Sequence, residues 1–288
     1  MENDQAKSLR ERLKTLRMQA KSIAVMSGKG GVGKSNFSLN FSLALQKAQK
    51  RVLLFDLDIG MGNIDILVGE SSRLTIVDFF NKNVSLSDII STGPNNLDYI
   101  SGGTGLGTIF RLSEEKFQRF IQELERLFNA YDFVIFDMGA GISEDSLRFI
   151  LCVDEIIVIT TPEPTSMTDA YAAIKHICVN HETMSFSIVV NRAYNRKIGD
   201  STFNRLAQTM KQFLKREATL LGTIPDDSTI MKAVIDQKPF LMYQPNCHAS
   251  KAIFKIANDF IYRQSSSIDE KDAKPFIAKL KYFFMKGR

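Results

Sequence analysis

The stretch Gly28-Lys29-Gly30-Gly31-Val32-Gly33-Lys34-Ser35 decides the fold of this chain. It fits the phosphate-binding loop pattern, in which a glycine and four further residues precede Gly-Lys-Ser or Gly-Lys-Thr. The apolar run 23–26 before it predicts a buried strand, and helically spaced apolar residues predict a helix over 35–48 after it. A strand-loop-helix unit of this kind predicts an anion site at the start of the helix.

Each residue type in this loop has a physical role. Glycines let the backbone curl so that several N–H groups point at one anion, and the helix N-terminus adds partial positive charge. We expect Lys34 to reach the β- and γ-phosphates of a nucleotide and the Ser35 hydroxyl to bind Mg²⁺. The predicted nucleotide contacts of the loop are Gly28, Lys29, Gly30, Gly31, Val32, Gly33, Lys34, Ser35 and Asn36.

Strand and helix patterns alternate along the chain. Apolar runs predict strands over 22–27, 51–57, 97–101, 132–138, 154–161, 186–191 and 219–224. Helices are predicted over 35–48, 113–129, 143–151, 165–181, 201–216, 228–236 and 247–263. This alternation predicts an α/β fold, with a doubly wound, mostly parallel sheet and helices on both faces, plus terminal amphipathic helices. The expected organisation is a helix over 1–20, a nucleotide-binding domain over 21–263, and a linker with a terminal helix over 264–288.

Two predicted strands end in acidic residues, where ligands gather in such sheets. The first ends in Asp56 and Asp58, and the second in Asp137 followed by Gly139. An apolar strand ending in aspartate suits a ligand of Mg²⁺ or of its waters, which we assign to Asp137. The backbone N–H of Gly139 is expected near the γ-phosphate.

These residues, together with the sequence 56–63 and Gly141, resemble the MinD/ParA group of deviant Walker A ATPases over about 21–263. The resemblance implies ATP or ADP and Mg²⁺ as cofactors, slow ATP hydrolysis, and a homodimer formed with ATP. It implies that Lys29 crosses the dimer to the partner's nucleotide, that Asp58 orients the attacking water, and that Asp56 supports Mg²⁺ beside Ser35 and Asp137. It also implies adenine contacts from Asn191, Pro225 and Asp226.

The N-terminal segment narrows the resemblance to FlhG proteins, also called YlxH or FleN. Its residues Asp4, Gln5, Ala6, Leu9 and Arg10 are similar to the Asp-Gln-Ala-x-x-Leu-Arg activator motif of that family. The resemblance implies that this segment stimulates the GTPase FlhF, that the protein regulates flagellar number and placement, and that flagellar C-ring proteins are candidate partners. An ordinary capped surface helix is the alternative interpretation of the same residues.

The C-terminal segment has the pattern of a basic amphipathic helix. Lysine and arginine surround one apolar face, which consists of Phe276, Ile277, Leu280, Phe283 and Phe284. Such a face predicts reversible binding to anionic lipid at the cytoplasmic side of the inner membrane. A helix docked on its own domain is the alternative, and both arrangements are compatible with different nucleotide states.

Charge and cysteine usage weigh against other functions of the same fold. The net charge is +5, and each tail, 1–21 and 264–288, holds six basic and three acidic residues, which leaves −1 for the remainder. A near-neutral body argues against a DNA-binding partition ATPase, so no nucleic-acid partner is expected. The three dispersed cysteines argue against an iron–sulfur carrier. A MinD/ParA-type ATPase that positions another cargo, at the division site or on DNA, stays as the alternative function, and a biosynthetic enzyme would leave both basic tails unexplained.

Overall fold

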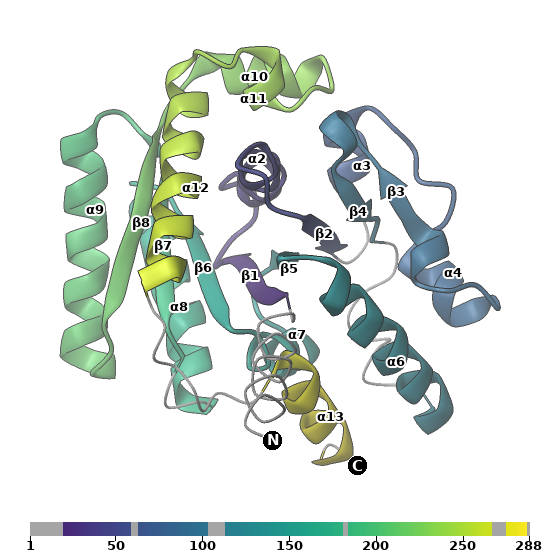
Figure 1. Ribbon diagram of the computed structural model, residues 1–288. Coiled ribbons are helices and arrows are strands. Elements are labelled where there is room, and N and C mark those ends of the chain that lie inside the picture. The colour runs from purple at the N-terminus through teal and green to yellow at the C-terminus, as the bar shows by residue number, and fades with distance from the viewer. Residues whose placement is uncertain (1–19, 59–62, 103–112, 181–183, 267–274, 287–288) are drawn as a thin grey trace, which may run out of the picture.

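The computed structural model describes residues 20–58, 63–102, 113–180, 184–266 and 275–286. They form an eight-stranded sheet with the strand order β3-β4-β2-β5-β1-β6-β7-β8 (Figure 1). Neighbouring strands are parallel, except that β3 and β4 pair antiparallel. The strands are β1 Lys21–Ser27, β2 Val52–Leu57, β3 Ile90–Thr92, β4 Asp98–Ile100, β5 Phe133–Ala140, β6 Glu155–Thr160, β7 Phe186–Ala193 and β8 Ala218–Pro225.

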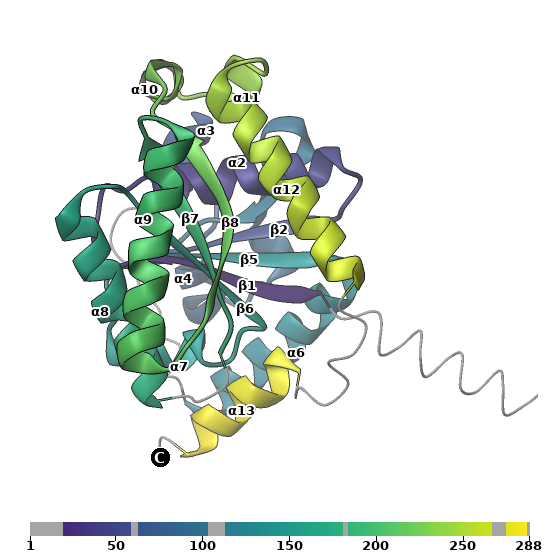
Figure 2. The ribbon, with the colours of Figure 1, turned by 90° about the vertical axis from the view of Figure 1, so that its left-hand side faces the viewer.

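Helices cover both faces of the sheet, as predicted (Figures 1 and 2). One face carries α2 Lys34–Lys47, α3 Asn63–Val68, α10 Ser228–Ile235, α11 Phe240–Tyr243 and α12 His248–Ser266. The other carries α4 Ile76–Asn81, α6 Glu114–Ala130, α7 Glu144–Ile150, α8 Pro164–Asn180, α9 Arg196–Thr209 and α13 Phe276–Lys286. Short 3₁₀ turns span Ser87–Ile89 and Pro94–Asn96, and a π-helical turn, η3, spans Met210–Leu214.

Apolar strands with side chains on both faces create two cores. β6 is buried along its whole length. Ile156 and Val158 pack into the core under α6, α7 and α8, whereas Ile157 and Ile159 pack into the core under α2 and α12. A continuous apolar run is therefore what a central parallel strand requires, because successive side chains point to opposite faces.

The strand order places a topological switch point beside β1. The chain passes from β1 through α2 to β2 on one side, and later from β5 through α7 to β6 on the other. Ligands of doubly wound sheets bind at such a point, outside the carboxyl ends of the strands. The phosphate-loop sequence leaves β1 at this place.

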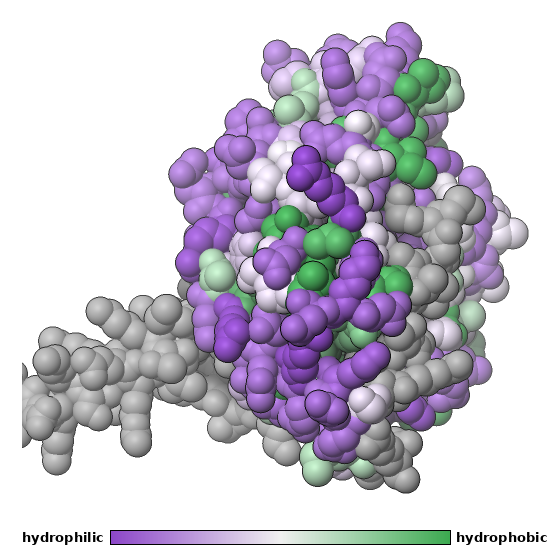
Figure 3. Space-filling view, turned by 90° about the vertical axis from the view of Figure 1, so that its right-hand side faces the viewer, coloured by the Kyte–Doolittle hydropathy of each residue, from purple (hydrophilic) through white to green (hydrophobic). Residues whose placement is uncertain are grey.

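Within the described residues the predicted elements are present, with four short additions. The sequence prediction missed β3, α3, α4 and α11, each only three to six residues long. Helix α9 also begins earlier than the predicted residue 201, because the Asn195 side chain accepts a hydrogen bond from the Ile198 N–H and caps the helix. The side of the molecule at the β3 edge, where α3, α4 and α6 lie, is mostly hydrophilic, with smaller apolar patches (Figure 3).

The apolar side of α13 is packed against the protein's own core. Phe276, Ile277, Leu280 and Phe284 are each at most 4% exposed. Phe284 stacks on Phe117 of α6 with ring centroids 3.5 Å apart, and Lys281 forms an ion pair with Glu125 at 2.6 Å. This is the docked arrangement that the sequence left open beside membrane binding.

Two sequence predictions fall wholly or partly outside the described residues. They are the N-terminal activator helix, up to residue 19, and the linker predicted to begin at residue 264, whose first residues 264–266 instead belong to α12. Residues 59–62 of the Asp56–Asn63 motif also lie outside. The GTPase contacts predicted for Asp4, Gln5, Ala6, Leu9 and Arg10 therefore stay predictions.

Candidate nucleotide-binding site

The loop between β1 and α2 has the close backbone approaches that its glycines allow. A Cβ atom at Gly28 would lie 2.1 Å from the backbone carbon of Asp169 in α8, so only glycine fits against that helix. Gly33 has a φ of 90°, and a Cβ there would lie 2.4 Å from Asn191 Nδ2. The loop is therefore held between α8 and the end of β7, in a conformation that side chains would prevent.

Helix α2 begins at this loop and directs its first N–H groups toward the carboxyl edge of the sheet. Its first residue is Lys34, and the Phe37 N–H donates back to the Gly33 carbonyl at 2.9 Å. Its N-cap residue is Gly33, which has no side chain that could cap the helix. These amide groups and the helix dipole form an anion-binding end, which is what the loop sequence predicted.

Lys34 joins the loop to the two predicted acidic strand ends. Its Nζ lies 3.1 Å from Asp137 Oδ1 and 3.9 Å from Asp58 Oδ2. Only 7% of the Lys34 side chain is exposed, and Asp137 is fully buried. The sequence-predicted cation and both predicted carboxylates thus meet in one site, from β1–α2, β2 and β5.

The carboxylate of Asp137 has the surroundings expected of a group that binds Mg²⁺ or one of its waters. Its Oδ1 accepts from Ser38 Oγ at 2.8 Å and from Lys34, whereas its buried Oδ2 has no hydrogen-bond partner among the described residues. A buried carboxylate oxygen without a partner is costly, and a hydrated cation satisfies it. Together with the hydroxyl of Ser35, this oxygen fits the predicted metal role.

Asp56 and Asp137 are register neighbours on β2 and β5. Asp56 accepts backbone bonds from Asp58 at 3.0 Å and from Ile64 at 3.2 Å. Burial, followed by repulsion from Asp137, raises the pKa of Asp56 to about 7, although these two bonds and Lys34 act in the opposite direction. A nearby cation reverses that balance, because it favours the ionised carboxylate.

Asp58 and Gly139 lie side by side near the mouth of the site. A Cβ atom at Gly139 would lie 3.1 Å from Asp58 Oδ1, and Asn63 Nδ2 donates to Asp58 Oδ2 at 3.0 Å. Asp58 is about a quarter exposed, unlike the buried Asp56 and Asp137. A partly hydrated carboxylate beside Lys34 has the chemistry to orient a water molecule.

The second loop lysine, Lys29, points away from this cluster within the single chain. Its Nζ lies 2.7 Å from Glu163 Oε2 and 3.2 Å from Thr165 Oγ1. The hydrogen bond from Lys29, followed by its charge, lowers the pKa of Glu163. The sequence did not single out Glu163, although it follows the carboxyl end of β6, where a functional acidic residue is expected.

A cavity of about 780 Å³ adjoins the start of α2, between the ends of β7 and β8 and helix α10. Asn191 and Asp226, two of the predicted adenine contacts, line it, whereas Pro225 lines a separate cavity along the outer edge of β8. The Asn191 amide donates to the Val32 carbonyl at 2.8 Å and accepts from the Arg192 N–H. Asn191 therefore also braces the phosphate loop.

Sequence reasoning missed most of the apolar lining of this cavity. It includes Phe37 of α2, Ile230, Met231 and Val234 of α10, and Phe240 of α11. The helical spacing of 230, 231 and 234 was the available signal, since it places three apolar side chains on one side of α10. An apolar cavity beside an anion-binding loop has the size and polarity to hold a nucleobase.

A phosphate loop at the switch point, a buried lysine, and an acidic residue ending the adjacent strand define a P-loop nucleotide-binding protein. The ParA family model, described as NUBPL iron-transfer P-loop NTPase, matches residues 19–261. The chain therefore belongs to the ParA/MinD family of P-loop NTPases, as the sequence resemblance predicted.

Curated relatives are similar over most of the chain. Antiactivator FleN of Pseudomonas aeruginosa is 33% identical, covering 82% of this chain and 84% of FleN. Flagellum site-determining protein YlxH of Helicobacter pylori is 31% identical, covering 90% and 89%. Septum site-determining protein MinD of Bacillus subtilis is 30% identical, covering 91% and 97%.

Solved structures confirm the fold. MinD of Pyrococcus furiosus has a TM-score of 0.68 at 22% identity, over 85% of this chain and 99% of that one. MinD of Pyrococcus horikoshii, solved with Mg-ADP, has a TM-score of 0.67 at 22% identity, over 88% and 100%.

The remaining titratable groups form no metal centre in the described part of the chain. No group of three or more histidine, cysteine, aspartate and glutamate side chains there is arranged to hold a metal ion. Cys152 and Cys247 are buried and Cys178 is partly buried, each as a free thiol. Among the described helices, none is both long and apolar enough to cross a bilayer.

Proposed function

We propose that this chain is an ATP-switched, dimerising regulator of flagellar number and placement that associates reversibly with the membrane. The family membership supports the nucleotide chemistry, and two relatives of at least 31% identity, FleN and YlxH, support the flagellar role. The single observation that carries the switch is Lys34 between Asp137 and Asp58, beside a buried carboxylate oxygen without a partner.

In this proposal the residues of the site bind Mg-ATP and position water for hydrolysis. Ser35, Asp137 and Asp56 would hold Mg²⁺ directly or through its waters, and the cation, when bound, would neutralise phosphate charge. Lys34 exchanges its contact with Asp137 for the β- and γ-phosphates. Asp58 orients the water that attacks the γ-phosphate, which gives ADP and phosphate.

Dimerisation requires the Lys29 side chain to leave Glu163 of its own chain and to reach the nucleotide of the second copy. The Lys29–Glu163 pair is largely solvent-exposed, so its net stability is small and a phosphate on a second copy competes with it effectively. The ATP-bound dimer then has one Lys29 directed at each partner's nucleotide. With ADP the lysine returns to Glu163 and the dimer separates.

The state of α13 follows from the same switch. Phe276 of α13 stacks on Phe136 of β5, with centroids 5.4 Å apart, and Phe136 immediately precedes Asp137. Phe276 also contacts Phe149 of α7, the helix that follows the end of β5 at Gly139–Gly141. A shift of this strand end on ATP binding would alter the surface on which Phe276 packs, which releases the helix to anionic lipid. Two released helices in one dimer bind far more strongly than one, through effective concentration.

The N-terminal segment, outside the described residues, acts on the partner GTPase FlhF. Its Asp-Gln-Ala-x-x-Leu-Arg sequence supports this role. The second candidate function is a MinD-type ATPase acting at the division septum, which the similarity to Bacillus subtilis MinD favours. Stimulation of FlhF by a peptide of residues 1–20, and failure of a peptide with Gln5 and Leu9 replaced by alanine, would favour the flagellar role.

The switch is tested with Asp58→Ala. Mg²⁺-dependent ATP hydrolysis should fall at least about 100-fold while ATP binding stays within a few-fold of the native value, because the substitution removes water positioning and keeps the phosphate contacts. Size-exclusion chromatography of this variant should give a dimer with ATP and a monomer with ADP. Native hydrolysis by Asp58→Ala, or a dimer without nucleotide, would contradict the proposal.

A further inference from the structure

Strand β8 forms one edge of the sheet and lacks the features that normally block an edge. Its eight residues, Ala218–Pro225, include no charged side chain, and proline occurs only at the last position. The opposite edge is β3, a strand of three residues. Natural sheets protect their edges with charge, proline or short length, so β8 is the edge open to pairing.

The outer side of β8 is unpaired along its length. Its partner on the inner side is β7, and no described residue forms a backbone hydrogen bond with its outer side. In a parallel strand, every second residue points its N–H and C=O groups to the same side. About half of the β8 peptide groups are therefore directed outward, where another strand can accept and donate hydrogen bonds.

A groove follows this edge between two helices. Figure 2 shows β8 running between α9 and α12 with its outer edge facing the viewer. The cavity here has a volume of about 410 Å³ and is lined by β8 residues 220–223 and by Ala252 and Ile256 of α12. Leu220, Leu221, Ala252 and Ile256 make the base of the groove mostly apolar.

Thr223 adds a polar group without a partner inside this groove. Its Oγ1 atom is buried and forms no hydrogen bond with any described residue. Gly199 of α9 faces it, and a Cβ atom at that position would lie 2.6 Å from Oγ1. A buried hydroxyl is normally paired, so the contact between β8 and α9 is incompletely satisfied at this point of the groove.

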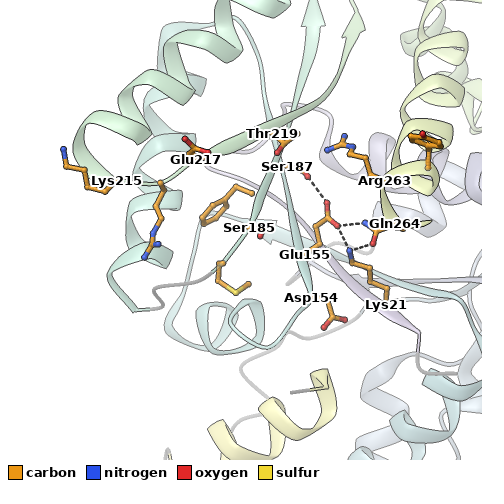
Figure 4. Close-up of a pocket in the computed structure, with 14 residues that line it drawn as sticks. Lys21, Asp154, Glu155, Ser185, Ser187, Lys215, Glu217, Thr219, Arg263 and Gln264 are labelled. Carbon is orange, nitrogen blue, oxygen red and sulfur yellow. Dashed lines mark hydrogen bonds and ion pairs between the residues drawn. The ribbon is translucent and has the colours of Figure 1, made fainter. Parts of the chain in front are cut away.

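The charges along the groove differ between its two ends. Over residues 220–225 the walls carry opposite charges in equal number, from Arg196 and Asp200 of α9 and Lys255 and Asp259 of α12. At the start of β8 the adjoining cavity is lined by four basic side chains, Lys21, Lys215, Arg216 and Arg263, and by three acidic ones, Asp154, Glu155 and Glu217, which leaves an excess of one positive charge. Figure 4 shows Lys215, Glu217 and Arg263 around the start of the strand. Deeper in that cavity, Glu155 is bonded to Lys21, Ser187 and Gln264.

We propose that β8 binds an extended segment of a partner protein as an added strand. The segment is uncharged where it lies along residues 220–223, and acidic where it reaches the basic end near Arg263. One extended segment fits between α9 and α12, whereas a second copy of this chain would bring its own α9 and α12 against the same helices. Backbone pairing provides the affinity, and the basic end fixes the direction of the segment.

The proposal is tested with two fluorescein-labelled decapeptides, which carry three acidic residues at one end and alternating threonine and valine elsewhere. One has the acidic residues at its N-terminus and the other at its C-terminus. Fluorescence anisotropy with the nucleotide-free, full-length protein should show saturable binding of one peptide. Hydrogen exchange should become slower in β8, because its outward N–H groups become paired.

Two variants locate the binding site. Ala252→Trp fills the groove and should weaken binding at least about tenfold, whereas Ala172→Trp on the exposed surface of α8 should leave it unchanged. Arg263→Glu should weaken binding about three- to tenfold and reduce its salt dependence, with Lys251→Glu on the same helix as the matched control. Circular dichroism verifies that each variant is folded.

Several results would overturn the proposal. One is the absence of saturable binding up to about 1 mM peptide. Another is binding to Ala252→Trp with the same affinity as to the native protein. A third is hydrogen exchange that becomes slower elsewhere in the protein but not in β8. If sedimentation shows a dimer that Ala252→Trp abolishes, the β8 edge binds a second copy of this chain and not a partner segment. Because these measurements use neither nucleotide nor lipid, their failure leaves the proposed ATP switch untouched.

Discussion

The phosphate loop and helix α13 differ in how completely their sequences determine their surroundings. Around the loop, Gly28 and Gly33 allow backbone approaches that no other residue permits, and Lys34 is held by Asp137 at 3.1 Å. Helix α13 instead relies on an apolar face. Here Phe276 and Phe284 are buried by stacking on Phe128 and Phe117. A lipid phase would remove the same face from water. Directional contacts specify one partner, whereas apolar burial specifies only an environment.

The largest expected effect is on ATP affinity, and it comes from the phosphate loop. Lys34→Ala removes the cation that faces the phosphates, so ATP affinity should fall more than about 100-fold. Isothermal titration with Mg-ATP measures it. Lys47→Ala, at the far end of the same helix, is the control and should bind normally. Near-native affinity in Lys34→Ala would show that the loop is not the phosphate site.

The next effect concerns the stability that docked α13 gives to the domain. Phe276 is 2% exposed and contacts three aromatic rings, so Phe276→Ala should lower the free energy of unfolding by about 3–5 kcal/mol. Tyr282→Ala on the exposed side of the same helix should change it by less than about 0.5 kcal/mol.

Urea unfolding of the nucleotide-free protein measures both values. Equal stability of the two variants would mean that α13 spends little time docked. That result would weaken the contrast between the loop and the helix, because the helix would then have no defined partner in the free protein.

A smaller effect is expected from the exposed pair that holds Lys29. Glu163→Gln keeps the shape and removes the charge that competes for Lys29, so the ATP-bound dimer should become up to about fivefold tighter. Lys29→Ala should stay monomeric with ATP. Sedimentation velocity in the Asp58→Ala background measures both, and a weaker dimer in Glu163→Gln would assign Glu163 to the dimer contact itself.

The last expected effect is a pH dependence of the nucleotide-free protein. Burial and repulsion from Asp137 raise the pKa of Asp56 to about 7 in the folded protein, from the ordinary aspartate pKa of 3.8. Between these two pH values the folded protein keeps a proton on Asp56 that the unfolded chain has released. Stability should therefore decrease as the pH rises from about 4 to about 7. Melting curves in EDTA measure this, and Asp56→Asn should flatten the trend.

The directional parts of the site were predictable from sequence and the rest was not. Lys34, Asp58 and Asp137 follow from a motif and from strand ends, and the sheet brings them together. Ser38, which donates to Asp137, lies one helical turn after Lys34 and was within reach of the same reasoning. Glu163 and Asn63 were not, because their contacts join segments whose relative placement only the folded chain defines. The docking of α13 could not be predicted, because its apolar face can be buried equally well against the domain or in lipid.

The most direct measurement of the switch tethers α13 in place. Lys281 and Glu125 are paired at 2.6 Å, so cysteines at these two positions, joined by a short reducible bismaleimide, hold the helix on α6. In the Asp58→Ala background with Mg-ATP, the tethered protein should stay off anionic vesicles in flotation. After reduction of the tether it should float with them, and with ADP it should not float in either form. Equal flotation of tethered and reduced protein would contradict the release of α13 by ATP.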